Sequence, residues 1–256
     1  MLKKKLKILV TNDDGINAPG LAVLAEEAKK FGDVTVIAPA EQCSGMSVKL
    51  TIQKPMIFSE CKDFPVHGVK AYSLAGTPVD CTKLAIKNIF PEKPDYVFSG
   101  INAGFNAGFD CMYSGTIGAI HEALTFGVKA IAFSVGDITE GSWIGDSNFD
   151  IFNLTADDII KELMNTDIEK NAFWNVNFPA CPKEHFQGVL HNMKLSQVRP
   201  YDDILKKDIL PDGTVTYTLV GNLINKESAP AGSDIHAVLN GYVSIGKVYN
   251  SYIVTE

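Results

Sequence analysis

The sequence lacks several features that would place it in a special class of protein. Only five of its 256 residues are cysteines, and no two of them form a CxxC pair, so neither a disulfide framework nor a cysteine zinc site is indicated. No apolar run approaches the roughly 18 residues of a membrane span. Lysine and arginine (23) are outnumbered by aspartate and glutamate (30), which disfavours a nucleic acid polymer or a membrane as partner. We expect reduced thiols, a cytoplasmic location, and small molecules or further copies of the chain as partners.

Two common phosphate-binding signatures and a secretory signal are also missing. Neither GxxxxGK[ST] nor GxGxxG occurs, which excludes a P-loop and a dinucleotide fingerprint. The charged N-terminus is followed only by the short apolar run Ile8–Val10 and then by acidic residues, unlike a signal peptide. With 46% hydrophobic and 21% charged residues, the composition is that of a soluble globular chain. We expect a single α/β domain over residues 1–256.

Short apolar strands alternate with helical segments in the first half of the chain. The predicted strands are Lys7–Thr11, Val34–Ala38, Tyr96–Phe98 and Ala130–Val135. The predicted helices are Leu21–Phe31, Val79–Phe90 and Thr116–Phe126. This alternation is typical of βαβ units, and it predicts a mostly parallel sheet with helices on both faces.

The second half is less regular and predicts an extension that bears a hairpin. A helix is expected at Leu154–Met164, a strand at Phe173–Asn177, a short capped helix at Ser233–Asn240 and a strand at Tyr242–Val248. The stretch VTYTLVG alternates strictly behind the turn Pro211-Asp212-Gly213, which indicates a β-hairpin. We predict a core over about residues 1–190 and a C-terminal extension over about 191–256.

Polar loops follow three of the predicted strands. They are Asp13-Asp14-Gly15, PAEQCSGMS (Pro39–Ser47) and the long glycine-rich segment Ser99–Thr116. Ligands of open parallel sheets bind outside the carboxyl ends of the strands. If the strands share one sheet, all three loops meet at one edge, and this convergence carries more weight than any single motif.

The loops offer hard oxygen ligands. Asp13 and Asp14 supply carboxylates, Ser44 a hydroxyl, and Asn102 and Asn106 amide oxygens. Such a set suits Mg²⁺, Mn²⁺ or Ca²⁺ rather than zinc or copper. A divalent ion would also offset the repulsion between the adjacent carboxylates.

A phosphate site is predicted beside these ligands. Ser114-Gly115-Thr116 stands at the start of a predicted helix, where free N–H groups and the helix dipole favour phosphate. A metal beside such a cradle points to phosphoryl chemistry, with the ion acidifying a bound water.

Simpler interpretations stay open from the residues alone. Asp-Asp-Gly is also a common turn, and Ser114 is also a plain helix cap. A thiol nucleophile at Cys43 has no histidine partner nearby in sequence. Ser44 lies in CSGMS rather than G-x-S-x-G, so a hydrolase elbow is not supported.

Four segments follow one another in a characteristic order: TNDDGINAPG, PAEQCSG, AGTPVDC and SGINAGFNAGFDCMYSGTIGAIHEA. Together they resemble the SurE survival-protein family of metal-dependent nucleotidases, and weaker similarity continues in NVNFP and SDIHAVLNGYVSI. The resemblance implies a Rossmann-like three-layer core and hydrolysis of nucleoside 5′- and 3′-monophosphates, with short polyphosphate as a further substrate. It also implies a homodimer or homotetramer, assembled partly through an exchanged C-terminal segment.

The resemblance also implies roles for individual residues. One Mg²⁺ or Mn²⁺ per subunit would be held by Asp13, Asp14, Ser44 and Asn102. Phosphate would be held by Asn106, Ser114, Gly115 and Thr116. From their chemistry, Asp13 and Asp14 are the expected catalytic residues, with either of them as general base; a metal-activated water is the preferred nucleophile, and an aspartyl-phosphate route stays open.

The chain departs from the family pattern at two places. Cys43 stands where the family usually has a basic residue, and Gly246-Lys247-Val248 replaces the usual Thr-Pro-Leu. Two other functions remain as alternatives: a phosphate- or nucleotide-binding regulatory module without turnover, and a structural oligomer. A phospho-acceptor receiver domain would need an aspartate after the third strand, where this chain has Ser99-Gly100.

Overall fold

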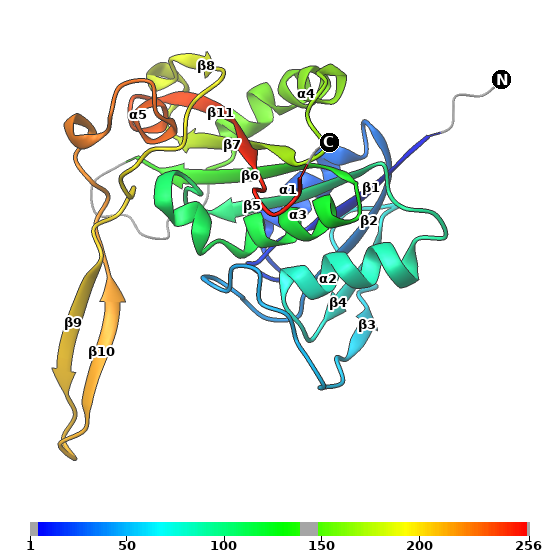
Figure 1. Cartoon of the computed structure of the whole chain (residues 1–256), viewed down its shortest axis with the longest axis horizontal. Coiled ribbons are helices and arrows are strands. Elements are labelled where there is room, and N and C mark those ends of the chain that lie inside the picture. Colours follow the sequence, from blue (N-terminus) through cyan, green and yellow to red (C-terminus); the bar gives the residue numbers. More distant parts are fainter. Residues whose placement is uncertain (1–4, 139–147, 255–256) are drawn as a thin grey trace.

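In the computed structural model, which describes residues 5–138 and 148–254, a nine-stranded sheet lies between two layers of helices (Figure 1). The strand order is β3-β4-β2-β1-β5-β6-β7-β11-β8. The strands are β1 (Leu6–Thr11), β2 (Gly32–Pro39), β3 (Phe58–Glu60), β4 (Lys70–Leu74), β5 (Tyr96–Ala103), β6 (Lys129–Asp137), β7 (Ala172–Ala180), β8 (Gly188–Leu190) and β11 (Tyr242–Tyr249). The six strands from β4 to β7 in this order are mutually parallel, whereas β3 and β11 run antiparallel to β4 and β7.

The strand order reverses beside β1. From β1 the chain proceeds to β2 and β4 on one side, then returns to β5 on the other side of β1. The carboxyl ends of β1 and β5 therefore flank a topological switch point, where connections diverge and leave room for a ligand.

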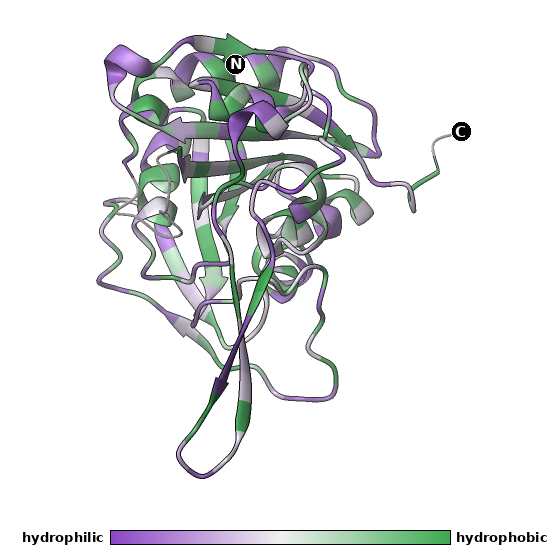
Figure 2. Cartoon of the chain, turned by 90° about the vertical axis from the view of Figure 1, so that its left-hand side faces the viewer, coloured by the Kyte–Doolittle hydropathy of each residue, from purple (hydrophilic) through white to green (hydrophobic). Residues whose placement is uncertain are grey.

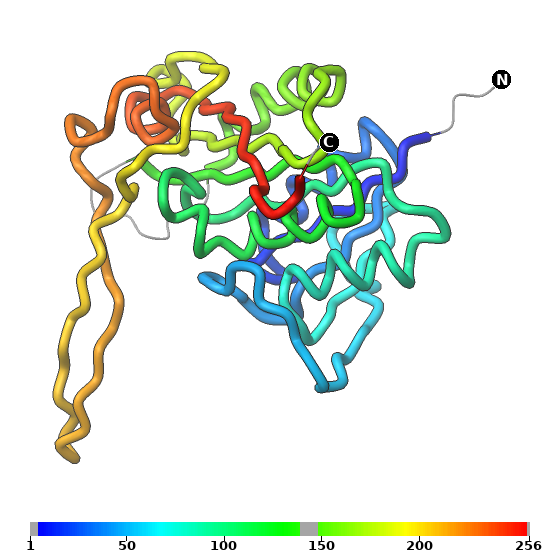
Figure 3. The backbone as a smooth tube through the Cα atoms, viewed as in Figure 1, coloured from blue at the N-terminus to red at the C-terminus, as the bar shows by residue number. Residues whose placement is uncertain are grey.

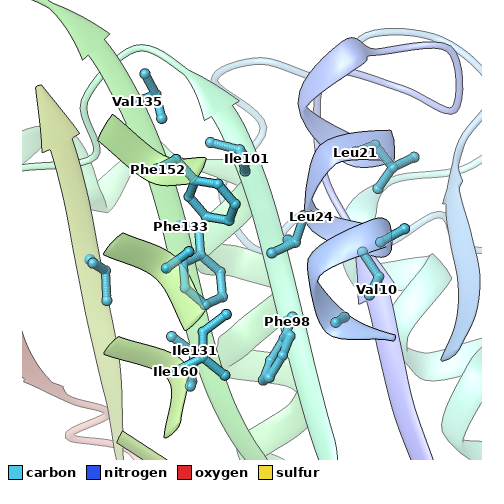
Figure 4. Close-up of a cluster of buried hydrophobic side chains, with 14 of the residues drawn as sticks. Val10, Leu21, Leu24, Phe98, Ile101, Ile131, Phe133, Val135, Phe152 and Ile160 are labelled. Atoms are coloured by element: carbon cyan, nitrogen blue, oxygen red, sulfur yellow. The ribbon is translucent and has the colours of Figure 1, made fainter. Parts of the chain in front are cut away.

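Helices cover both faces of the sheet. They are α1 (Pro19–Ala28), α2 (Pro78–Leu84, continued by a π-helical turn, Ala85–Ile89), α3 (Gly115–Thr125), α4 (Asp150–Asn165) and α5 (Asp234–Leu239). Helices α1 and α4 bury one face, as Figure 4 shows for Leu21, Phe98, Phe133 and Ile160. Helices α2 and α3 pack on the other face. Because neighbouring residues of β1 point to opposite sides, Ile8 joins the first cluster and Leu9 the second. The predicted Rossmann-like three-layer core is confirmed.

Three short strands and one strand extension were not expected from the sequence. Strands β3 and β8 have three residues each, and every residue of β3 is exposed, so no apolar pattern marks them. Strand β4 reads KAYSL, also without alternation. The prediction that a strand ends at Phe98 was wrong, because β5 continues through Ala103 after a register shift between Ser99 and Asn102. A bulge thus lets the strand resume behind Gly100 (φ 137°), whose peptide bond to Ile101 is cis.

The predicted hairpin is present and projects from the body as a separate two-stranded sheet (Figures 1 and 3). It consists of β9 (Ile204–Ile209) and β10 (Val215–Val220), which pair antiparallel. Nearly all of its residues are exposed, although hydrophobic residues occur along its length (Figure 2). Residues after the hairpin return to the core, since β11 lies in the main sheet between β7 and β8.

Within the described residues, no helix is long and apolar enough to cross a membrane.

Candidate active site

The loop after β1 is a closed turn that carries both aspartates. The Asn12 side chain donates to the Gly15 carbonyl (3.0 Å) and accepts from the Gly15 N–H (3.2 Å). Gly15 has φ +98°, a conformation that side-chain-bearing residues rarely adopt. Asp13 becomes buried (3% exposed) and Asp14 half-buried. Asp-Asp-Gly is therefore a turn and also part of the candidate site, because the turn holds the two carboxylates in place.

Asp13 lies directly against the first turn of α3. The Thr116 hydroxyl donates to Asp13 Oδ1 over 2.6 Å. A Cβ placed on Gly115 would lie 2.8 Å from the Asp13 Cβ and 3.0 Å from Oδ2, so only glycine fits there. Burial, and then the charge of Asp14, raise the pKa of Asp13 to about 6, against the lowering effect of hydrogen bonds from Thr116. A nearby cation would relieve this cost of ionisation.

The second loop joins the first through Gln42 and Cys43. Burial raises the pKa of Asp14, and a hydrogen bond from the Gln42 side chain opposes that rise. Gln42 Nε2 also donates to the Ser44 hydroxyl over 3.0 Å. The Cys43 N–H donates to the Asp13 carbonyl over 2.7 Å. Ser44 is thereby held beside the aspartates.

The thiol of Cys43 is buried rather than presented for reaction. Its Sγ contacts the carbonyl oxygens of Glu41 (3.5 Å) and Gly76 (3.7 Å). Burial, and then the charge of Asp13, raise the pKa of this thiol. A raised pKa lowers the thiolate fraction and with it the reactivity, so the structure supports no nucleophilic role.

Strand β5 brings Asn102 to the same place. The Ala103 N–H donates to Asp14 Oδ2 over 3.0 Å. Because Asn102 directly precedes Ala103 in the chain, this bond brings Asp14 close to Asn102. Asn102 Nδ2 is engaged with the Gly104 carbonyl (2.9 Å). The side-chain carbonyl oxygen of Asn102 is therefore the atom that could bind a cation.

The predicted phosphate residues divide into two groups. Ser114 caps α3, with its hydroxyl accepting from the Ile117 N–H over 3.1 Å, and Gly115 and Thr116 follow at the same helix end. Asn106 is held elsewhere: its Nδ2 donates to Ser134 of β6 over 2.8 Å, and its backbone bonds to asparagines of β7. In the part of the chain that the structure describes, Asn106 makes no hydrogen bond to either aspartate.

The donor set fits a hard cation. Among residues 5–138 and 148–254, no group of three or more His, Cys, Asp and Glu side chains could hold a metal. A metal at Asp13 and Asp14 would therefore take further ligands from hydroxyl and amide oxygens, such as those of Ser44 and Asn102. An all-oxygen set of this kind suits Mg²⁺ or Mn²⁺ and not a structural zinc ion.

Some residues that build the site escaped the sequence interpretation. Gln42 lies in the segment PAEQCSG, but no role was predicted for it, and only its contacts with Asp14 and Ser44 indicate one. Asn175 and Asn177 of β7 both donate to the Asn106 carbonyl, over 2.8 and 3.1 Å. Their spacing of two in a buried strand places both on one face, and this alternation was the signal that could have marked them.

Comparison with known proteins decides the family. A family model described as survival protein SurE matches residues 8–199. The chain belongs to the SurE family. A relative from Clostridium botulinum (strain 657 / Type Ba4), named 5′-nucleotidase SurE, is 34% identical over 242 residues, covering 94% of this chain and 91% of its own. A relative of the same name from Thermoanaerobacter sp. (strain X514) is 35% identical over 244 residues, covering 95% and 92%.

A solved SurE structure has the same fold. The crystal structure of the SurE protein from Aquifex aeolicus superimposes with a TM-score of 0.78 at 32% identity, covering 96% of this chain and 95% of that one. The resemblance predicted from sequence is thus confirmed. The departure from the SurE pattern at Gly246 also has a local explanation, because a Cβ there would lie 2.7 Å from the Met193 carbonyl oxygen.

Proposed function

We propose that this protein is a metal-dependent 5′-nucleotidase that hydrolyses nucleoside monophosphates to nucleoside and phosphate. The observation that carries the proposal is the contact of an adjacent carboxylate pair with a helix N-terminus: Thr116 donates to Asp13 over 2.6 Å. A cation site and a phosphate site would then share a border. The enzyme class agrees with the name that both curated relatives carry. Activity on 3′-monophosphates and on short polyphosphate forms part of the proposal.

The metal would be Mg²⁺ or Mn²⁺, one per subunit, held by Asp13, Asp14, Ser44 and Asn102. When bound, such an ion neutralises phosphate charge and lowers the pKa of a coordinated water. Gln42 orients Ser44 for this role through its 3.0 Å hydrogen bond. The Ala103 N–H fixes Asp14 over 3.0 Å.

The phosphate would lie at the start of α3. The N–H group of Gly115 and the hydroxyl of Ser114 are donors there, and the helix dipole favours the negative charge. Thr116 completes the same turn, with its hydroxyl and N–H directed to Asp13. The Ser114 oxygen already accepts from Ile117 (3.1 Å), so its proton remains for a phosphate oxygen. Asn106 would use the N–H that is not committed to Ser134.

The protein groups available for proton transfer are the two aspartates. Burial, and then the charge of Asp14, raise the pKa of Asp13 to about 6 when no cation is bound, and a bound cation would lower it. We favour water as the nucleophile. Hydrolysis of a nucleotide with a chiral phosphoryl group distinguishes the two routes. A single in-line attack of water inverts the configuration at phosphorus, whereas formation and hydrolysis of an aspartyl-phosphate by two in-line attacks retains it.

The decisive assay is release of phosphate from AMP, GMP and 3′-AMP with Mg²⁺ or Mn²⁺ against a chelator. We expect metal-dependent turnover that falls by at least a hundredfold in Asp14→Asn and stays unchanged in the exposed control Asp33→Asn. Nucleotide binding without turnover would instead support a regulatory module. Neither binding nor turnover would support a structural protein.

The hairpin is proposed to build a homodimer or homotetramer. It carries exposed apolar side chains on both strands, including Leu205, Ile209, Tyr217 and Leu219, and an isolated two-stranded hairpin is marginal in water. Light scattering of the full chain and of a variant with residues 204–220 replaced by a short turn tests this. A monomeric full chain would contradict it. All five cysteines are free, which supports the proposed cytoplasmic location.

A further inference from the structure

An exposed aromatic side chain stands beside the phosphate cradle. Tyr113 directly precedes Ser114, the cap of α3, and is 47% exposed. Its neighbours Phe109 and Met112 are 44% and 66% exposed. The other large aromatic side chains near the centre of the molecule, such as Phe98, are fully buried. Burial on folding therefore does not account for this apolar rim, which Phe109, Met112 and Tyr113 form in the segment that leads into α3.

The ring of Tyr113 is held in place rather than mobile. The Arg199 guanidinium lies over the ring, 5.1 Å from its centroid, and Nη2 donates to the phenol oxygen over 3.0 Å. Both backbone groups of Tyr113 form hydrogen bonds. Its carbonyl accepts from the Ser47 N–H (2.9 Å), and its N–H donates to the Asp110 carbonyl (3.0 Å). Arg199 thus covers part of a fixed ring, and the 47% exposure of Tyr113 leaves the remaining surface accessible to a ligand.

The charges around the ring select the kind of group that fits. Arg199 is paired with Asp203 over 2.6 Å and lies 3.7 Å from Asp110. Its charge is therefore balanced by two carboxylates, and an anion gains little here. A flat, uncharged aromatic group gains a stacking surface instead.

We propose that Tyr113 is the stacking platform for the nucleobase and the residue that makes the enzyme prefer nucleotides over other phosphate esters. The inference rests on the proposed function, because it takes Ser114–Thr116 as the phosphate site. When the phosphate of a nucleotide is bound at Ser114–Thr116, the ribose extends toward Tyr113, the residue before Ser114. The base then stacks on the Tyr113 ring. Every nucleobase has a π-face that can stack on the ring. We therefore expect the platform to distinguish nucleotides from phosphate esters without a base more strongly than it distinguishes one nucleobase from another.

The test compares a nucleotide with its baseless counterpart. The dissociation constants of AMP and of ribose 5-phosphate, each as its non-hydrolysable phosphonate analogue, are measured by calorimetry with Mg²⁺, for the full-length wild type and for Tyr113→Ala, Tyr113→Phe and the exposed control Tyr252→Ala. Stacking on an aromatic side chain is worth about 5- to 100-fold in affinity. We expect Tyr113→Ala to weaken AMP by that factor more than it weakens ribose 5-phosphate, and Tyr113→Phe to restore AMP binding to within about threefold of wild type.

Several outcomes overturn the proposal. They are equal weakening of both ligands, no weakening of either, and a wild type that binds AMP no tighter than ribose 5-phosphate. The first would make Tyr113 a support of the loop, and the second would leave the rim to a second copy of the chain. KM and kcat for AMP and ribose 5-phosphate themselves give a separate readout, in which the loss falls on KM for AMP. If the wild type binds AMP through Tyr113 but releases no phosphate, the platform stands and the proposed nucleotidase activity fails.

Discussion

Replacing Asp13 by asparagine is expected to abolish turnover and yet to stabilise the metal-free protein. Asp13 is 3% exposed, and burial together with Asp14 raises its pKa from 3.8 to about 6. At about 1.4 kcal/mol for each pKa unit, this difference corresponds to about 3 kcal/mol. Ionised Asp13 therefore lowers the free energy of unfolding whenever no cation is bound.

The sign follows from the two pKa values. The unfolded chain ionises near 3.8 and the folded chain near 6, so the destabilisation is absent below the first value, grows between the two, and is complete above the second. Asparagine has the same shape and can still accept the Thr116 hydroxyl, now at 2.6 Å from Oδ1. It loses the extra strength of a hydrogen bond to a charged oxygen, so we expect a net gain of about 1–3 kcal/mol in the free energy of unfolding.

Thermal and urea unfolding in a chelator measure this gain at neutral pH and near pH 4. For a chain of this size, each kcal/mol raises Tm by about 2–4 °C. The matched control is Asp33→Asn, an exposed aspartate paired with Lys5, which is expected to change stability by less than about 0.5 kcal/mol. Adding Mn²⁺ should stabilise the wild type by mass action and leave the Asp13 variant unchanged.

Two results would refute the reasoning. One is an Asp13→Asn variant that is less stable than the wild type at neutral pH in the chelator. The other is a gain of the same size near pH 4, where the carboxyl is protonated in the folded chain and only about half ionised in the unfolded chain, so that most of the destabilisation has disappeared.

Three further predictions concern the packing around the site. A Cβ on Gly118 would lie 2.1 Å from the Ser47 carbonyl oxygen, so Gly118→Ala should lower Tm and reduce kcat/KM at least tenfold by displacing the second loop, as thermal unfolding and AMP hydrolysis will show. Asn177→Leu leaves the Asn106 N–H (2.9 Å) without a partner and removes one of the two amide donors to the Asn106 carbonyl (3.1 Å), which Asn175 still contacts. Urea titration should therefore register a loss of about 2 kcal/mol; an unchanged midpoint would contradict the network. Cys43→Ser should retain at least a third of wild-type turnover, because the thiol is buried and its pKa raised; complete inactivation would reopen a nucleophilic role.

The parts of the fold that could be predicted are those in which buried positions produce a recognisable pattern of apolar residues in the sequence. Strand β1 lies between two helix layers, so Ile8, Leu9 and Val10 form a continuous apolar run. Strand β3 is held by pairing at the sheet edge with all its residues exposed, and pairing leaves no trace in composition. The extension of β5 depends on the register of its bulge against β6, which no local pattern specifies.

The candidate site divides in the same way. Convergence of the three loops was predictable, because the carboxyl ends of parallel strands share an edge whatever the side chains do. The individual partners were not predictable. The bond of Thr116 to Asp13 joins residues 103 apart in the chain, and the bond between the Asn106 N–H and Asn177 spans 71. Such pairings depend on the order of strands in the sheet, which the sequence does not state. For this reason a motif could assign Asn106 to phosphate, although its side chain bonds to Ser134 of β6.

The contact between Gly115 and Asp13 also bears on how a ligand is received. Their backbones are already in place, with only 2.8 Å between a virtual Cβ and the aspartate Cβ, so folding itself has met the entropy cost of ordering this part of the chain. Association then restricts mainly the small molecule and its water, as in other preorganised receptors. Crystals grown without nucleotide are accordingly expected to take it up by soaking with their lattice intact.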